Sequence, residues 1–203
     1  MRLYELGVCT MSETIEYYNR NAESFVSGTI NADMHEIRDR FLKHVKPGGM
    51  ILDAGCGSGR DSLAFMGAGY QVEAFDASPE ICRLASETLG FTVECKRFEE
   101  LTGESRYDGI WACASLLHVR EKDLPDVMHR LAKLLKPNGI LYASFKEGTT
   151  ERVKDGRFFH DMTEQSCYGL FSEAGLEVLE VNRNQDVREG RSGEFWVNII
   201  GEK

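Results

Sequence analysis

The stretch ILDAGCGSGRDS, residues 51–62, is the feature that most constrains how this chain folds. A short apolar run ends at Asp53, three glycines follow at positions 55, 57 and 59, and helix-forming residues begin at Arg60. Glycine adopts positive φ angles and lets a ligand approach the backbone, so the stretch predicts a buried strand, a tight turn and a helix. After the first strand of a doubly wound sheet, such a turn lies at the edge where these folds bind ligands.

Strand and helix patterns alternate along the rest of the chain. Strands are predicted for residues 50–52, 70–76, 91–95, 107–114, 140–145, 176–181 and 194–201, and helices for 12–25, 34–45, 60–68, 79–89, 123–136 and 162–174. Such alternation predicts an α/β fold, a Rossmann-like doubly wound sheet of seven strands with helices on both faces. Only residues 182–193 join the last two strands, which favours a mostly parallel sheet whose last strand is antiparallel.

The chain shows no repeat, no low-complexity stretch and no linker, and 203 residues usually build one core. We therefore expect a single domain, residues 1–203. Within it we expect an N-terminal helical cap (12–45), a cofactor-binding core (50–145), and a substrate-side loop with the C-terminal strands (146–203).

Composition narrows the classes of partner. A net charge of −9 and a pI of about 5.1 argue against a nucleic-acid partner, which requires a concentrated basic face. No apolar run approaches the roughly 20 residues of a membrane span, and no signal-peptide core is present. The six cysteines are scattered without a CxxC pair, so no metal site is expected. These features predict a reduced, cytoplasmic protein, and they leave the oligomeric state open.

Three nucleoside ligands compete for the glycine turn. Asp76 ends the next strand, 21 residues after Gly55, where its carboxylate can accept both hydroxyls of a ribose. A phosphate loop requires a lysine that this stretch lacks, and a dinucleotide site requires a third glycine where Arg60 stands. Asp53 suits a ligand that carries an α-ammonium group. S-adenosylmethionine, with an ammonium, a ribose diol and no phosphate, fits these residues best.

The segments LDAGCGSGRDS, FDAS, YDGIWACASLLHV and LKPNGILYASF together resemble the class I S-adenosylmethionine-dependent methyltransferases. The resemblance covers about residues 14–203. Within that superfamily, GCGSGRDSLAFMGAGYQVEAFDAS is similar to tellurite-resistance-type small-molecule methyltransferases. The motifs are specific for the cofactor and the fold, and they do not identify the substrate.

The resemblance implies a set of cofactor contacts. The methionine moiety would lie against the first loop, the ribose on the acid after the second strand, the adenine between the next two loops, and an N-terminal aromatic over the cofactor. The residues at the methionine moiety would be Asp53, Gly55, Cys56 and Gly57, and the residue at the ribose would be Asp76. The adenine would lie against Ala77, Phe98 and Glu99, with Ala114 and Leu116 closing the pocket. The N-terminal aromatic would be Tyr18. The family commonly has an acid where this chain has Arg97, so Glu99 or backbone carbonyls would recognise the adenine amine.

Residues for the substrate side are less constrained. His118 follows the fourth strand at the active edge, where it serves either as a general base or as a satisfied structural histidine. The polar segment 146–161 is expected to be a substrate lid, with Lys146 and Arg157 facing an anionic substrate or forming ion pairs within a solvated loop. Arg191, in the segment 186–196, is expected beside it.

The predicted reaction is in-line displacement of a methyl group from a sulfonium by a small-molecule acceptor. The electrophile is already activated, so positioning and exclusion of water supply most of the rate, and the sequence requires no particular catalytic residue. Three alternatives stay open at this point. One is a methyltransferase acting on a protein or tRNA, another is a nicotinamide-dependent Rossmann oxidoreductase, and the third is a cofactor-binding protein without catalysis.

Overall fold

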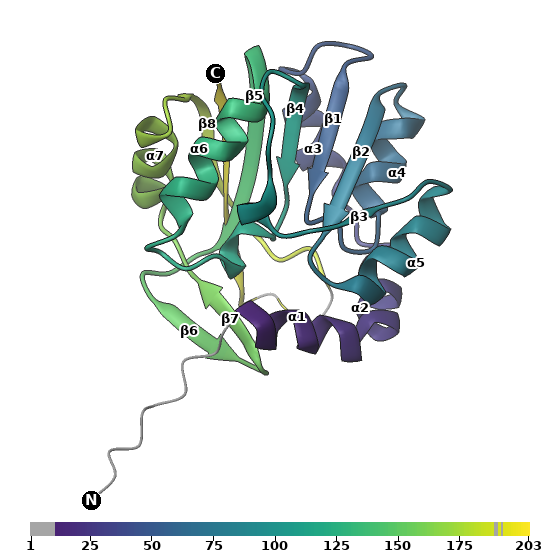
Figure 1. The fold of residues 1–203 in the computed structure, drawn as a ribbon. Helices are drawn as coiled ribbons and strands as arrows, with labels where there is room; N and C mark the ends of the chain where they lie inside the picture. The colour runs from purple at the N-terminus through teal and green to yellow at the C-terminus, as the bar shows by residue number, and fades with distance from the viewer. Residues whose placement is uncertain (1–10, 189–190, 192) are drawn as a thin grey trace, which may run out of the picture.

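The computed structural model describes residues 11–188, 191 and 193–203. Within this described part, seven strands form one sheet in the order β3-β2-β1-β4-β5-β9-β8 (Figure 1). The strands are β1 (Met50–Ala54), β2 (Gln71–Asp76), β3 (Glu94–Cys95), β4 (Tyr107–Ala112), β5 (Leu135–Lys146), β8 (Glu177–Gln185) and β9 (Phe195–Glu202). Neighbours from β3 to β5 pair in parallel, and β9 runs antiparallel to both β5 and β8. The predicted sheet, with its last strand antiparallel, is confirmed.

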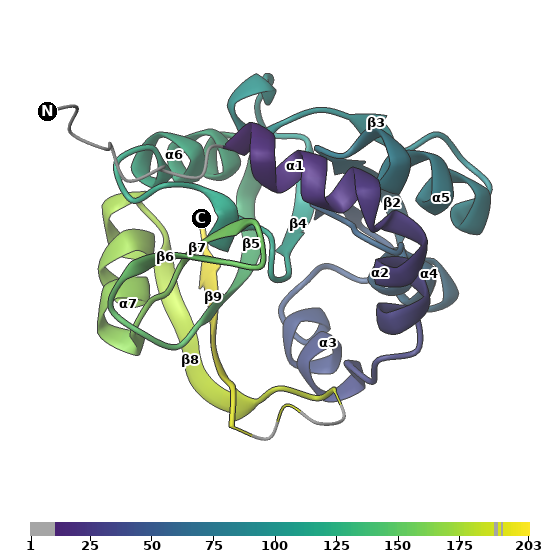
Figure 2. The same cartoon turned by 90° about the horizontal axis from the view of Figure 1, so that it is seen from below.

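Helices cover both faces of this sheet (Figures 1 and 2). One face carries α3 (His35–Leu42), α4 (Arg60–Gly67) and α5 (Pro79–Leu89), and the other carries α6 (Leu124–Leu134) and α7 (Glu164–Glu173). Under α3 and α4, Phe41 and Phe65 pack on Trp111, whose ring stacks on Tyr142 with the centroids 3.9 Å apart. The larger core lies under α6 and α7. Burial of both faces explains why β4 is apolar from Gly109 to Ala112.

The carboxyl edge of the parallel strands is crossed by α1 (Met11–Arg20) and α2 (Ala22–Thr29) (Figure 2). Beside α1 lies a hairpin of β6 (Glu151–Lys154) and β7 (Arg157–His160). The Thr14 hydroxyl of α1 accepts the Phe158 N–H of β7 at 3.0 Å. The Ser78 hydroxyl at the start of α5 donates to the Asn19 side chain at 2.6 Å. Thus α1 is attached to elements on both sides of the edge.

Two boundaries near this edge differ from the sequence prediction. Helix α2 continues through residues 26–29, which were expected to be a loop, because the Ile30 N–H still donates to Val26 at 2.9 Å. Strand β3 contains only Glu94 and Cys95 of the predicted 91–95, because only its end pairs with β2.

The predicted loop 146–161 is also different: residues 151–160 form a hairpin rather than a loop. Its turn is Asp155-Gly156, with φ angles of +52° and +75°. Two adjacent residues with positive φ match the twist of the flanking strands, and Asp-Gly is a strong hairpin signal. The tip of the expected lid is therefore an ordered two-stranded ribbon.

The connection from α6 to β5 is shorter than predicted. Helix α6 ends at Leu134, and β5 begins at the next residue, so Pro137-Asn138-Gly139 lies inside the strand rather than at a helix end. The register of β5 against β4 shifts there, between Tyr107 and Gly109. Asn138, at φ +61°, lies in this irregular stretch. No helix in the described residues has the length and apolarity needed to span a membrane.

Candidate active site

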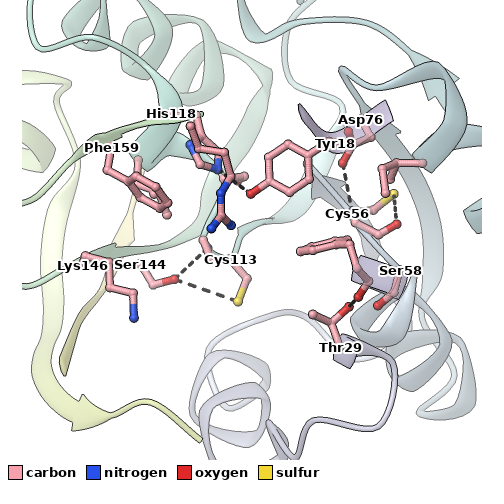
Figure 3. Close-up of a pocket in the computed structure, with 18 of the residues that line it drawn as sticks. Tyr18, Thr29, Cys56, Ser58, Asp76, Cys113, His118, Ser144, Lys146 and Phe159 are labelled. Atoms are coloured by element: carbon pink, nitrogen blue, oxygen red, sulfur yellow. Dashed lines mark hydrogen bonds between the residues drawn. The ribbon is translucent and has the colours of Figure 1, made fainter. Parts of the chain in front are cut away.

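A cavity of about 240 Å³ opens at the carboxyl edge, where the chain after β1 and the chain after β4 diverge. Its walls come from the glycine loop, the ends of β2, β4 and β5, the helices α1 and α2, the hairpin and described residues between 184 and 198. Figure 3 shows Asp76, Cys56 and Ser58 on one side of it and Ser144, Lys146 and Phe159 on the other. Doubly wound sheets bind ligands at this topological switch point.

Gly55 and Gly57 of the glycine loop lie too close to neighbouring side chains to carry a side chain of their own without strain. The N–H groups of Gly55 and Cys56 both donate to the Phe75 carbonyl, at 2.9 and 3.0 Å, which joins the end of β1 to β2. At Gly55, where φ is +82°, a Cβ would lie 2.5 Å from the Ser115 Cβ. At Gly57, where φ is +54°, it would lie 3.2 Å from a ring carbon of Phe25. Larger residues would therefore deform the cavity wall.

Asp53 lies at the base of this loop and is only 2% exposed. Its Oδ2 accepts the Ser62 hydroxyl at 2.6 Å. Burial, and then the nearby negative charge of Asp61, raise the pKa of Asp53 to about 7. A ligand ammonium at this carboxylate would favour its charged form. The electrostatics therefore fit the amino-acid end of S-adenosylmethionine.

Asp76 ends β2 at the cavity wall, as predicted, but it also holds the loop itself. Its Oδ2 accepts the Gly57 N–H at 3.1 Å, and its Oδ1 accepts the Ser78 N–H at 3.0 Å. Burial raises its pKa, and these backbone hydrogen bonds oppose that shift. The carboxylate is thus fixed in orientation at the position expected for a ribose diol. The sequence pattern did not reveal this structural role.

The remaining predicted cofactor contacts are not all in the cavity. Ala77, Phe98, Glu99 and Ala114 line it. The Ala114 N–H donates to the Ser144 hydroxyl at 2.8 Å. Leu116, in contrast, is fully buried in the core, and Leu117 reaches the cavity instead. After β4 the chain forms a short turn of 3₁₀ helix, so adjacent residues point in different directions.

Cys56 lines the cavity within the glycine loop and is 9% exposed. Burial, followed by the charges of Asp53 and Asp76, raises the pKa of its thiol well above the ordinary value. The thiol is therefore protonated at neutral pH and is a weak nucleophile. Cys56 fits the loop as a small side chain.

Tyr18 and His118 point toward each other at the cavity wall (Figure 3). The phenol oxygen of Tyr18 is 2.9 Å from His118 Nε2, and Nδ1 is 2.6 Å from the Phe158 carbonyl oxygen. Because a carbonyl only accepts, Nδ1 carries the proton and Nε2 accepts from Tyr18. Burial, with a smaller contribution from the charge of Arg157, lowers the pKa of His118 to about 4. The imidazole is therefore neutral at pH 7.

The three basic residues predicted for the substrate side all line the cavity. Lys146 is 6% exposed, its Nζ donates to Asp186 at 2.9 Å and to Glu194, and it lies 4.0 Å from the centre of the Trp196 ring. Arg191 approaches Glu194 at 3.5 Å. Arg157 lies on the hairpin at the start of β7.

Sequence reasoning missed a buried acid behind the loop. Asp61 is 5% exposed and accepts hydrogen bonds from Arg38 at 2.8 Å, Arg60 at 2.6 Å and Trp111 Nε1 at 3.0 Å. These bonds hold the pKa of Asp61 below its ordinary value against the effect of burial. Arg60, which replaces the third glycine of a dinucleotide site, therefore anchors the first turn of α4. An adjacent Arg-Asp pair after the last loop glycine is the only signal in the sequence.

Among the described residues, no three His, Cys, Asp or Glu side chains lie together as a metal site. The cysteines in this part of the chain are free thiols.

Comparisons with known proteins agree with this geometry. A family model described as a methyltransferase domain matches residues 51–139. An uncharacterized methyltransferase of Emericella nidulans is 25% identical over 94% of this chain and 85% of its own length. The structure of Burkholderia thailandensis 1,6-didemethyltoxoflavin-N1-methyltransferase has a TM-score of 0.77 and 23% identity, covering 95% of this chain and 86% of that one. A Mesorhizobium loti S-adenosylmethionine-dependent methyltransferase has a TM-score of 0.70 at 14% identity, covering 88% and 100%.

The sheet order and the glycine-loop cavity define a Rossmann-like fold with a nucleoside site at its switch point. With the matches above, the chain is a class I S-adenosylmethionine-dependent methyltransferase, and S-adenosylmethionine is its cofactor. The alternative of a nicotinamide-dependent oxidoreductase is therefore rejected. The narrower similarity to tellurite-resistance-type enzymes stays a prediction.

Proposed function

We propose that the enzyme methylates a small molecule bound in the part of the cavity beyond the glycine loop, which we call the acceptor chamber. The chamber is lined by Tyr18, Ser144, Lys146, Arg157, Phe159 and Trp196. The single observation that carries the proposal is its cover: α1 and the hairpin lie over the carboxyl edge, joined by the Thr14–Phe158 hydrogen bond. A small acceptor suits a chamber of this kind better than a protein or tRNA surface. The similar Burkholderia enzyme was solved with the small molecule 1,6-didemethyltoxoflavin bound.

The cofactor would be held by the residues of the glycine loop and its neighbours. Asp53 would pair with the ammonium, Asp76 with the ribose hydroxyls, and Phe98 would lie against the adenine. S-adenosylmethionine, when bound, supplies a methyl group on an electrophilic sulfonium. The work left to this chain is to bind the acceptor, align it and exclude water.

The Tyr18–His118 pair is our candidate for handling a proton. Neutral His118 presents an accepting Nε2, which is the state a general base requires. For an acceptor that loses a proton from oxygen or nitrogen, we propose that the proton moves to Nε2 after Tyr18 turns away from it. An acceptor that is already anionic at its reacting atom needs no such step.

The first experiment measures ligand choice by thermal unfolding. S-adenosylmethionine or S-adenosylhomocysteine should raise the melting temperature, because a ligand that binds only the folded state stabilises it by mass action. NAD should leave it unchanged. Methyl transfer is then followed by mass spectrometry with small thiols, phenols, carboxylates and oxyanions. Transfer to proteins or tRNA of a cell extract, with none to any small molecule, would refute the proposal.

A further inference from the structure

The acceptor chamber has a charge balance opposite to that of the whole protein. The net charge of the chain is −9. The cavity wall formed by the end of β5, the hairpin and the described residues between 184 and 196 nevertheless contains six basic and three acidic side chains. They are Lys146, Arg152, Lys154, Arg157, Arg188 and Arg191, against Asp155, Asp186 and Glu194. An excess of basic over acidic side chains on this wall favours an anionic ligand over a cationic one.

Most of these basic groups are already paired. Lys146 and Arg188 both bind the Asp186 carboxylate, at 2.9 and 2.6 Å. Arg152 on β6 makes two hydrogen bonds to Asp161. Lys154 and Arg191 each approach Glu194 at 3.5 Å. These pairs hold the walls of the chamber together, so their charges are largely neutralised within the protein.

Arg157 is different. Its guanidinium approaches the carboxylate of Asp155 at 3.7 Å, and the Asp155 side chain is 64% exposed, so this pair is weak. Yet the Arg157 side chain is only 15% exposed, and its Nε is buried without a hydrogen-bond partner in the described structure. A buried guanidinium N–H without an acceptor costs free energy that a bound anion would offset.

Aromatic rings and the Tyr18 phenol surround the guanidinium group of Arg157 and fix its orientation. The guanidinium carbon lies 4.5 Å from the centre of the Tyr17 ring and 5.2 Å from that of Phe159. Aromatic rings attract the cation without taking its in-plane N–H groups. One hydrogen bond reaches the Tyr18 phenol, which also contacts His118. The unpaired Nε–H of Arg157 therefore lies close to the proposed proton-handling pair.

We propose that Arg157 binds an anionic oxygen group, a carboxylate or a phosphate, of the methyl acceptor. A planar guanidinium donates two parallel hydrogen bonds to either group, and lysine does not reproduce this geometry. The proposal rests on the proposed function, because it assigns the substrate class of the same chamber. Arg157 is a specificity-determining residue in this scheme.

The test measures binding of three matched probes to the enzyme saturated with S-adenosylhomocysteine: benzoate, phenyl phosphate and benzamide. One or both anions should bind at least about tenfold more tightly than the neutral amide, and their ratio identifies the preferred group. Arg157→Met should weaken anion binding by about 10- to 100-fold and leave benzamide unchanged. Arg157→Lys should restore part of the loss. Arg83→Met, which removes an arginine of α5 outside the cavity, should match the parent.

Retained affinity for S-adenosylhomocysteine shows that each variant is folded. If Arg157→Met does not fold, the anion affinity of Arg157→Lys relative to the parent tests the proposal. The proposal is overturned if benzamide binds as well as both anions, if neither anion binds at millimolar concentration, or if Arg157→Met and Arg157→Lys both keep the full anion preference of the parent. Methyl transfer to neutral small molecules only would also overturn it and leave the proposed function standing. Anion binding at Arg157 with methyl transfer only to macromolecules would refute the proposed function and leave the anion site at Arg157 standing.

Discussion

Replacing Asp76 by alanine separates its two roles. The carboxylate accepts the N–H groups of Gly57 and Ser78 and, in our assignment, the two ribose hydroxyls of the cofactor. Hydrogen bonds to charged groups contribute about 1.5–3 kcal/mol each, and water at this half-buried position replaces part of that. We expect the free energy of unfolding of the ligand-free protein to fall by about 1–3 kcal/mol. We expect affinity for S-adenosylhomocysteine to fall by about tenfold to several hundredfold.

Asp108 offers a matched control. It lies in β4 near the opposite edge of the sheet, where its Oδ2 accepts the Met50 N–H at 2.8 Å and the Lys136 ammonium at 2.6 Å. Asp108→Ala should therefore lose a similar amount of stability, about 1–3 kcal/mol, with no change in cofactor affinity. Titration calorimetry measures binding, and urea unfolding of the ligand-free proteins measures stability.

Two outcomes would refute this reasoning. If Asp76→Ala binds S-adenosylhomocysteine as tightly as the parent, the ribose assignment is wrong. If Asp108→Ala weakens binding by the same factor as Asp76→Ala, the loss reflects general destabilisation and not a contact with the ligand.

Three further predictions follow from the site. Gly55→Ala should lose about 3 kcal/mol or more of unfolding free energy, because the new carbon would lie 2.5 Å from the Ser115 Cβ. Gly57→Ala should lose only about 1 kcal/mol, because its new carbon would lie 3.2 Å from the Phe25 ring, which can move. Urea unfolding that gives the opposite order would contradict this packing. The pKa of His118 is about 4 in the folded protein against about 6.5 when unfolded, so stability should fall, by at most about 3 kcal/mol, as the pH drops from 6.5 to 4. His118→Gln should remove that part of the pH dependence, and unfolding curves with equal pH slopes would count against it. Lys146→Met should cost about 2–4 kcal/mol in denaturant unfolding, because the buried Asp186 carboxylate loses a cation, and unchanged stability would disprove that role.

The cofactor half of the site was predictable because local sequence determines it. Gly55, Gly57 and Asp76 lie at strand ends whose periodicity is clear, and parallel strands bring their carboxyl ends to one edge. Leu116 was misplaced because a 3₁₀ turn after β4 rotates successive side chains, and apolarity alone does not show which residue faces a cavity.

The acceptor half was less predictable because its contacts join distant segments. Lys146 meets Asp186 forty residues later, and Thr14 meets Phe158 across 144 residues. Such pairs leave no periodic signal in one sequence. The hairpin is the exception, since the Asp155-Gly156 turn was visible in the sequence but was assigned to a loop.

The strand order has a consequence for how the molecule forms. β9 follows every other strand of the described sheet along the chain, yet it lies between β5 and β8. Until it inserts, the long apolar strand β5 keeps a bare edge of main-chain donors and acceptors, which other chains can join. The glycine loop and its flanking strands close through contacts within the preceding residues, whereas Lys146 finds Glu194 only as the last strand docks. We therefore expect the nucleoside pocket to form before the acceptor chamber during folding, and the late insertion of β9 to be the step most exposed to aggregation.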